Sequence, residues 1–210
     1  MPEPASDPAP DPAPDPAPDP APDPAPDSAP DSAPDSAPDA PEPLVEVILE
    51  DARWHAAGLE PLAESAARAA LAGVGRDPRR HEIALLACSD ARIAGLNGDF
   101  RGKPTPTNVL SWPDFDGLVP EPDPMAERLF LGDIAIAYDT CQREAEAGGI
   151  PFCDHVSHLV VHGVLHLLGH DHEEDADAEA MEALETKVLA SMGVPNPYSR
   201  EERPSGASAG

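Results

Sequence analysis

The sequence predicts a single compact α+β domain in which one small mixed β-sheet packs with helices. Two observations support this fold class. Segments with the short apolar pattern of strands are intermixed along the chain with segments of helical periodicity, and two adjacent helices close the series. Residues 44–194 contain no internal repeat, which is consistent with one folded unit.

Composition separates this domain, residues 44–194, from two extensions. Residues 1–43 repeat Asp-Pro-Ala-Pro and then Asp-Ser-Ala-Pro, with no aromatic residue and no cation. Because the prolines remove backbone donors and there is little apolar surface to bury, we expect a disordered acidic tail there. It has neither the basic start nor the apolar core of a secretory signal. Residues 195–210 are expected to form a flexible C-terminal tail.

The charge of the chain limits its partners. The net charge is −27, and because eleven acids and no base lie in residues 1–43, residues 44–210 still carry −16. A chain this acidic is a poor nucleic-acid binder on composition alone. No apolar run is long enough to span a bilayer, so no membrane association is expected. Cys88, Cys141 and Cys153 are scattered and odd in number, which favours free thiols in a reducing cytoplasm.

The first half of the domain predicts two strands and two helices. The strands are Leu44–Glu50 and His81–Ala87, which are short and apolar. Between them, Pro61–Gly73 has Ala-rich helical spacing and a closing glycine, which predicts a helix that packs on the sheet. Ser89 is a suitable N-cap for a short helix that ends near Asn97.

A loop and two further strands follow. Gly98–Asn108 is polar and rich in glycine and proline, which predicts a loop. Val109–Trp112 predicts an edge strand that Pro113 stops. Leu129–Ala137 has the clearest strand pattern in the chain, and its Gly132-Asp133 pair predicts a bulge.

Three helices complete the predicted domain, at Asp139–Ala147, Phe152–Leu168 and Asp175–Met192. The first ends at two glycines, and the second carries most of the histidines. The third has an acidic first turn that suits the helix dipole. Its stripe of Ala180, Leu184 and Val188 is expected to face the core.

The candidate chemistry lies in the histidine-bearing helix, because six of the eight histidines fall between residues 155 and 172. Packing alone gives no reason for such a cluster, since buried imidazoles need polar partners. His162 and His166 stand four residues apart, so on a helix both rings lie on one face. Gly169 can take a positive φ and end the helix, which returns His170 or His172 toward the same point. Three nitrogen ligands with an open fourth position is the layout of catalytic zinc.

The same spacing, His162-x3-His166-x2-Gly169-x2-His172, also matches the zinc ligands of metzincin peptidases. Those enzymes have a glutamate directly after the first histidine as the general base, whereas Gly163 stands at that position here. A zinc metallopeptidase would therefore lack its proton acceptor, and it remains the alternative enzyme hypothesis.

The run HLVVHGVLHLLGHDH, from His158 to His172, resembles the signature of the YbeY family of bacterial endoribonucleases. Three further stretches agree with that family in the expected order: FRGK at 100–103, TNVLSWP at 107–113 and LGDI at 131–134. The resemblance spans residues 44–193 and does not include the acidic tail. His170 stands where the family often has an aromatic residue, and Trp112 where phenylalanine is usual.

The resemblance implies a zinc-dependent endoribonuclease that cleaves single-stranded RNA, with one Zn²⁺ per chain. It implies His162, His166 and His172 as the metal ligands and Arg101 as the catalytic arginine, although the spacing alone leaves His170 open as the third ligand. An arginine there is suited to a bidentate phosphate contact. The implied role is rRNA 3′-end maturation and ribosome quality control in the cytoplasm. The implied partners are precursor rRNA and the small ribosomal subunit, and DNA is not an expected partner.

A third hypothesis is a non-catalytic ribosome-assembly factor that uses zinc only for stability. Because the chain is acidic, the positive potential for RNA would come from zinc, Arg101 and Lys103. Three further cations, Arg76, Arg79 and Arg80, form either a solvated turn or an additional RNA contact.

Overall fold

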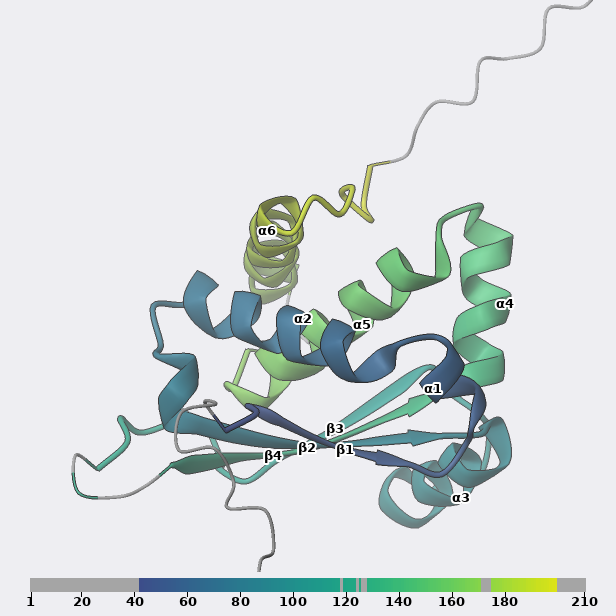
Figure 1. Ribbon diagram of the computed structural model, residues 1–210, viewed down its shortest axis with the longest axis horizontal. Helices are drawn as coiled ribbons and strands as arrows, with labels where there is room; N and C mark the ends of the chain where they lie inside the picture. Colours follow the sequence, from purple (N-terminus) through teal and green to yellow (C-terminus); the bar gives the residue numbers. More distant parts are fainter. Residues whose placement is uncertain (1–41, 118, 124, 126–127, 171–174, 200–210) are drawn as a thin grey trace, which may run out of the picture. The chain divides into compact units, whose positions relative to one another are not determined.

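The computed structural model describes residues 42–117, 119–123, 125, 128–170 and 175–199. The described part confirms the α+β class: its mixed sheet has the strand order β1-β2-β4-β3 (Figure 1). Three strands are mutually parallel, β1 (Val45–Leu49), β2 (His81–Cys88) and β4 (Leu129–Ala137). The fourth, β3 (Val109–Pro113), runs antiparallel beside β4 at the edge of the sheet, as the sequence predicts.

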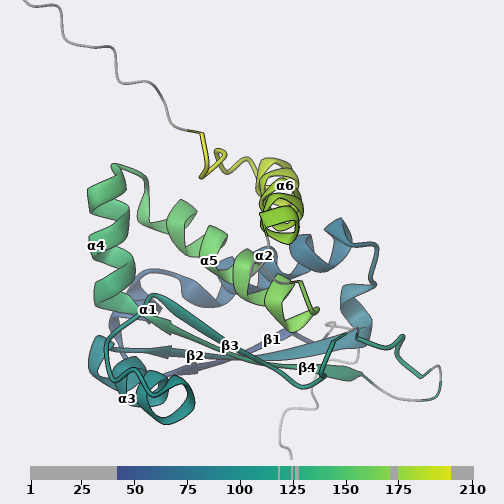
Figure 2. The same ribbon diagram turned by 180° about the vertical axis from the view of Figure 1, so that it is seen from behind.

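Helices cover the two faces of this sheet unequally (Figures 1 and 2). One face carries α1 (Arg53–Ala56), α2 (Leu59–Gly73), α4 (Tyr138–Gly148) and α5 (Phe152–Leu167). On that side α6 (Asp175–Ser191) packs against α2 and α5 as an outer layer. The other face carries α3 (Asp90–Arg101). A one-turn 3₁₀ helix, Pro78–Arg80, leads into β2.

The main hydrophobic core lies between the sheet and the pair α2 and α5. Side chains of β2 alternate, so that Ile83 and Leu85 reach this core together with Leu71 of α2 and Val164 of α5. A smaller cluster lies under α3, where Ile93 packs on the opposite face of the sheet. The histidine-bearing helix is therefore fixed along one whole side by the main core.

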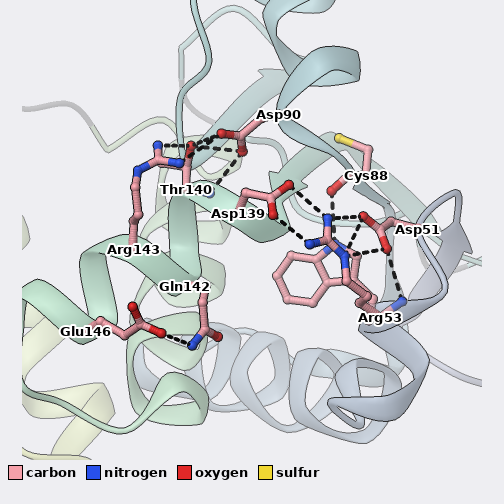
Figure 3. Close-up of polar contacts among 10 residues, drawn as sticks. Asp51, Arg53, Cys88, Asp90, Asp139, Thr140, Gln142, Arg143 and Glu146 are labelled. Carbon is pink, nitrogen blue, oxygen red and sulfur yellow. Dashed lines mark hydrogen bonds and ion pairs between the residues drawn. The ribbon is translucent and has the colours of Figure 1, made fainter.

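The carboxyl ends of the parallel strands are joined by a polar cluster (Figure 3). The Arg53 guanidinium donates to Asp51 and to Asp139, both at 2.6 Å, and so links α1 to α4. The Arg53 guanidinium is exposed to solvent, and exposed ion pairs contribute little to stability. Trp54 beside them is fully buried and its Nε1 donates to the Cys88 carbonyl at 3.1 Å, so the indole is the main anchor of this end.

The bulge predicted at Gly132 is confirmed. The β2–β4 register shifts between Glu82, which faces Phe130, and Ala84, which faces Asp133. Gly132 adopts a φ of 136°, and a Cβ there would collide with the carbonyl oxygen of Trp112. The bulge thus requires glycine and lets β3 lie close to β4.

The prediction that α3 ends near Asn97 is wrong, and this correction concerns the site. Ser89 caps the helix as expected, with its Oγ accepting from the backbone N–H of Arg92. The helix then continues to Arg101 and ends at Gly102, whose φ is 68°. The side chain of Asn97 donates to the Thr105 carbonyl at 2.9 Å, which folds the following loop back onto the added turn.

The core stripe predicted for the last helix is also partly wrong. The buried residues of α6 are Met181, Glu185, Val188 and Leu189, whereas Ala180 is exposed. An acidic residue therefore occupies a core-facing position of this helix.

The predicted disordered tail at residues 1–43 lies outside the described residues up to residue 41, and it stays a prediction, as do the domain boundaries at 44 and 194. None of the helices in the described part combines the length and the hydropathy that crossing a bilayer would require.

Candidate functional site

A pocket of about 770 Å³ lies beside the edge strand β3. Its walls come from the end of α3, the strand, the loop after the strand and the C-terminal half of α5: Arg101, Thr107, Asn108, Val109, Ser111, Pro113, Phe115, Asp116, Gly117, His162, His166, Gly169 and His170. The pocket therefore brings the predicted catalytic arginine, Arg101, next to two of the three predicted metal ligands, His162 and His166. The arginine is far from both histidines in the sequence.

Gly163 allows α5 to approach the sheet at this place. A Cβ on Gly163 would lie 3.0 Å from the Cδ1 of Ile134 and 3.2 Å from the Oγ of Ser111. The helix backbone is thus close to β3 and β4, and the rings of His162 and His166 line the pocket at the strand edge. A glutamate at position 163 would have to enter this contact with the sheet.

The end of α5 has the hydrogen bonds of a Schellman motif. The backbone N–H of His170 donates to the Leu165 carbonyl and that of Gly169 to the His166 carbonyl, both at 3.0 Å. Gly169 has a φ of 85°, which confirms the predicted left-handed turn. A Cβ on Gly169 would lie 2.5 Å from the carbonyl oxygen of Gly117, so the turn is packed against the loop that forms the opposite wall.

The two histidines of α5 present nitrogens to one point. The Nε2 atoms of His162 and His166 are 3.0 Å apart, and the ring centroids are 4.5 Å apart. The Nδ1 of His162 lies 2.7 Å from Oε1 of Glu185. Because an ionised carboxylate only accepts hydrogen bonds, the Nδ1 of His162 carries a proton, and the Nε2 of the same ring is the atom that faces His166.

Glu185 is the candidate-site residue that the sequence interpretation missed. Its side chain is 0% exposed, and it accepts hydrogen bonds from three side chains: Nδ1 of His162, Nε2 of His158 at 3.2 Å, and the hydroxyl of Tyr198. Burial alone would raise its pKa, but the three hydrogen bonds outweigh burial and hold the pKa of Glu185 at about 2. The carboxylate is therefore ionised at neutral pH and fixes the orientation of the His162 ring.

A signal for Glu185 is present in the sequence. It lies four residues after Met181 and three before Val188, so it belongs to the apolar stripe of α6 rather than to the acidic surface. A buried acid needs partners, and the only described element that supplies two of them one turn apart is α5, with His158 and His162.

Tyr198, in the segment after α6, supplies the third partner. Burial raises the pKa of its hydroxyl, and the hydrogen bond to ionised Glu185 raises it further. The His158 ring lies edge-on to Tyr198, with the centroids 5.7 Å apart. Although the sequence assigns residues 195–210 to a flexible tail, Tyr198 makes specific contacts with α5 and α6.

Arg101 differs from the other described arginines. Each of the others has a hydrogen bond or an ion pair: Arg53, Arg68, Arg76, Arg79, Arg80, Arg92, Arg128 and Arg143. Within the described ranges the Arg101 guanidinium has neither, and it is exposed at the pocket. It is thus available to an anionic ligand.

The basic cluster after α2 has a structural role. Arg76 donates to the carbonyls of Val119 and Pro120, and Arg80 donates to that of Asp123. Arg79 pairs with Asp77 at 2.9 Å. These contacts fasten the loop between β3 and β4, so Arg76 is not the solvated cation of the first interpretation, and an RNA contact at this cluster stays a prediction.

The other predicted ligands are placed as follows. His170 lines the pocket and is partly buried, which lowers the pKa of its imidazole. His172 lies in the segment 171–174, outside the described residues. His155 is turned away toward α4, where its Nε2 lies 2.9 Å from the carboxylate of Glu144. Without residues 171–174, the described ranges hold no group of three His, Cys, Asp or Glu side chains arranged around a metal position.

Comparison with known proteins gives matches over most of the chain outside residues 1–43. The family model described as "Endoribonuclease YbeY" matches residues 49–193. A protein of that name from Ruegeria pomeroyi is 54% identical over 166 residues, which cover 75% of this chain and 99% of that protein. One from Dinoroseobacter shibae is 54% identical over 164 residues, covering 73% of this chain and 90% of the relative. The solution structure of TM1509 from Thermotoga maritima covers 74% of this chain and 99% of that chain, with 23% identity and a TM-score of 0.46.

Proposed function

Since the chain belongs to the Endoribonuclease YbeY family, we propose that it is a zinc-dependent endoribonuclease specific for single-stranded RNA. The observation that supports this proposal is the shared pocket of His162, His166 and Arg101. It combines two nitrogens that face one point with a cation that has no partner among the described residues. A metal ion at the two nitrogens, together with the arginine beside it, could activate a nucleophile and stabilise the charge that develops during phosphodiester hydrolysis.

The donors present fit a zinc ion. Zinc–nitrogen bonds are about 2.0–2.1 Å long, so two nitrogens 3.0 Å apart can bind the same ion. His162, His166 and His172 would hold the metal, with Glu185 orienting the first of them. When bound, zinc lowers the pKa of its water to about 7 and acts as a Lewis acid toward a phosphoryl oxygen.

Arg101 would bind the scissile phosphate. Its planar guanidinium can donate two parallel hydrogen bonds to phosphate oxygens, and such bonds strengthen as negative charge develops on the oxygens. The position at the end of α3 matters for this role. A helix terminus holds the Cα more firmly than a long loop would, while the exposed side chain stays free to reach the substrate.

The metallopeptidase alternative loses support at position 163. The peptidase base would follow His162 directly, but Gly163 faces Ile134 and Ser111 at contact distance. The helix therefore turns this position toward the sheet, where a glutamate side chain would meet Ile134 and Ser111 at once. No other carboxylate takes that place on the described part of α5.

The proposed biological role is rRNA 3′-end maturation and ribosome quality control in the cytoplasm. The proposed partners are precursor rRNA and the small ribosomal subunit. Because the other described arginines are engaged and the chain is acidic, RNA affinity should be weak and should depend on a ribosomal partner for placement. Tight, sequence-independent RNA binding at physiological salt would contradict this expectation of weak affinity.

The proposal is tested with purified protein and a labelled single-stranded RNA. We expect the protein to cleave this RNA. A chelator should abolish the cleavage, added zinc should restore it, and the variants His166→Ala and Arg101→Ala should be inactive. Arg92→Ala is the matched control, because this arginine lies on the same helix but pairs with Glu50 away from the pocket. Cleavage that persists in chelator and in His166→Ala would refute zinc dependence.

The assembly-factor hypothesis needs a cellular measurement. In cells that depend on this protein, we expect Arg101→Ala to accumulate rRNA with an unprocessed 3′ end, although the variant folds and binds zinc normally. Normal rRNA processing by Arg101→Ala, together with loss of processing by an unfolded variant, would favour the non-catalytic role instead.

A further inference from the structure

Two aromatic residues are next to pocket residues in the chain, and their rings lie on the α3 side of the sheet. Phe100 precedes Arg101 at the end of α3, and Trp112 lies on β3 between Ser111 and Pro113, which both line the pocket. The two rings are in contact, with centroids 5.1 Å apart and planes at 56°. The pair forms the neighbouring surface on the α3 side of the edge strand.

Phe100 is exposed to a degree that packing does not explain. Its side chain is 65% exposed, the highest value among the described aromatic residues. It continues the inward face of α3, seven residues after the buried Ile93. The last turn of the helix extends past the small cluster under α3, so the ring contacts Trp112 and leaves much of its surface open.

We propose that Phe100 and Trp112 form a stacking platform for a nucleobase of the single-stranded RNA substrate. This inference rests on the proposed function, because it places a base next to the phosphate held by Arg101. Phe100 and Arg101 occupy consecutive positions in the last turn of α3, so their side chains point in different directions from one place and can contact neighbouring groups of one strand. The strand would cross the edge of β3 from the pocket to the platform.

The chemistry of the platform fits single-stranded RNA. Unpaired bases stack on aromatic side chains whatever their sequence, whereas the bases of a duplex are already stacked on each other. In an acidic protein with few available cations, stacking also supplies affinity that does not depend on positive charge. The platform would therefore explain a preference for single strands without a basic surface.

The test compares two probes on the zinc-loaded, full-length protein. One is a short 2′-O-methyl oligouridylate, and the other is an abasic oligomer with the same backbone and length. Affinity is measured by anisotropy of the labelled strand, which is confirmed intact afterwards. Phe100→Ala should weaken binding of the oligouridylate about tenfold and leave the abasic oligomer within twofold. Phe100→Tyr should bind both probes like the unmodified protein.

Two controls separate stacking from general effects. Ile150→Ala removes another exposed apolar side chain, away from the pocket, and should change neither affinity. Trp54 is fully buried, so a quench of tryptophan fluorescence by the oligouridylate reports Trp112 and should be absent in Trp112→Phe. Circular dichroism shows whether Phe100→Ala keeps the fold.

The outcomes distinguish this inference from the proposed function. If Phe100→Ala weakens both probes equally, or neither, the platform is refuted, while chelator-sensitive RNA cleavage would still support the nuclease. If the unmodified protein binds neither probe and cleaves no RNA, both proposals are refuted.

Discussion

The Oε1 of Glu185 lies 2.7 Å from the Nδ1 of His162, and the carboxylate to which this oxygen belongs is wholly buried. This contact sets the tautomer of the histidine and directs its second nitrogen into the pocket beside His166. The contact joins α6 to α5, so the last helix of the domain determines how the candidate metal site is presented.

Glu185→Gln is expected to lower zinc affinity about 10- to 100-fold, because loss of a carboxylate partner makes the ligating imidazole less basic and less well fixed. Competition with a chromophoric chelator at constant pH measures the change. Glu182→Gln is the matched control, since this glutamate is exposed on the same helix. Equal zinc affinity of Glu185→Gln and the unmodified protein would show that the carboxylate has only a packing role.

The identity of the third ligand can be decided by two single substitutions. We expect His172→Ala to lose stoichiometric zinc and His170→Ala to retain it, because the family resemblance places the ligand at 172. Metal analysis after exhaustive dialysis gives the zinc content per chain. The reverse result would assign the site to His170, which lines the pocket.

Gly169→Ala should destabilise the protein by about 1–3 kcal/mol. Its φ of 85° disfavours any side chain, and the added Cβ would lie 2.5 Å from the Gly117 carbonyl oxygen. Urea unfolding measures the free energy. Gly95→Ala should instead be neutral or slightly stabilising, because Gly95 lies inside α3 with no atom within 4 Å of the new Cβ. Equal stability of both variants would contradict this account.

His81 predicts a pH dependence of stability. Burial lowers the pKa of its imidazole, and the hydrogen bond to the Asp77 carbonyl offsets this only in part. The unfolded chain therefore binds a proton at higher pH than the folded protein does. The free energy of unfolding should fall as the pH drops below about 6.5, where an unperturbed histidine titrates.

Urea unfolding at pH 7.5 and 5.5 tests this expectation. Between these values the unmodified protein should lose about 1 kcal/mol more than His81→Phe, in which the titrating group is absent. The other histidines are common to both proteins and cancel in the difference. An equal loss in both proteins would show that His81 is protonated without effect on folding.

The sequence was a reliable guide wherever a local pattern determines the structure. Leu129–Ala137 is a strand because its run is apolar and β-branched, with a bulge where Gly132 stands. Gly169 ends the histidine-bearing helix because no other residue takes its φ so easily. In both cases the deciding interaction is between residues that are near in the chain.

Features that depend on distant residues were missed. The last turn of α3 forms in spite of Gly98, because the loop folds back and Asn97 bonds to Thr105. Glu185 has the spacing of the apolar stripe of α6, but the partners that hold its carboxylate come from α5 and from Tyr198 and cannot be read from α6 itself. The aromatic contact of Phe100 with Trp112 likewise depends on the packing of α3 across the sheet.

The hydroxyl of Tyr198 reaches Glu185 from beyond the last helix, a dozen residues before the chain ends. Shortening the protein after α6, or attaching a bulky purification tag there, would thus disturb the orientation of His162 in the candidate site without altering any residue that lines the pocket.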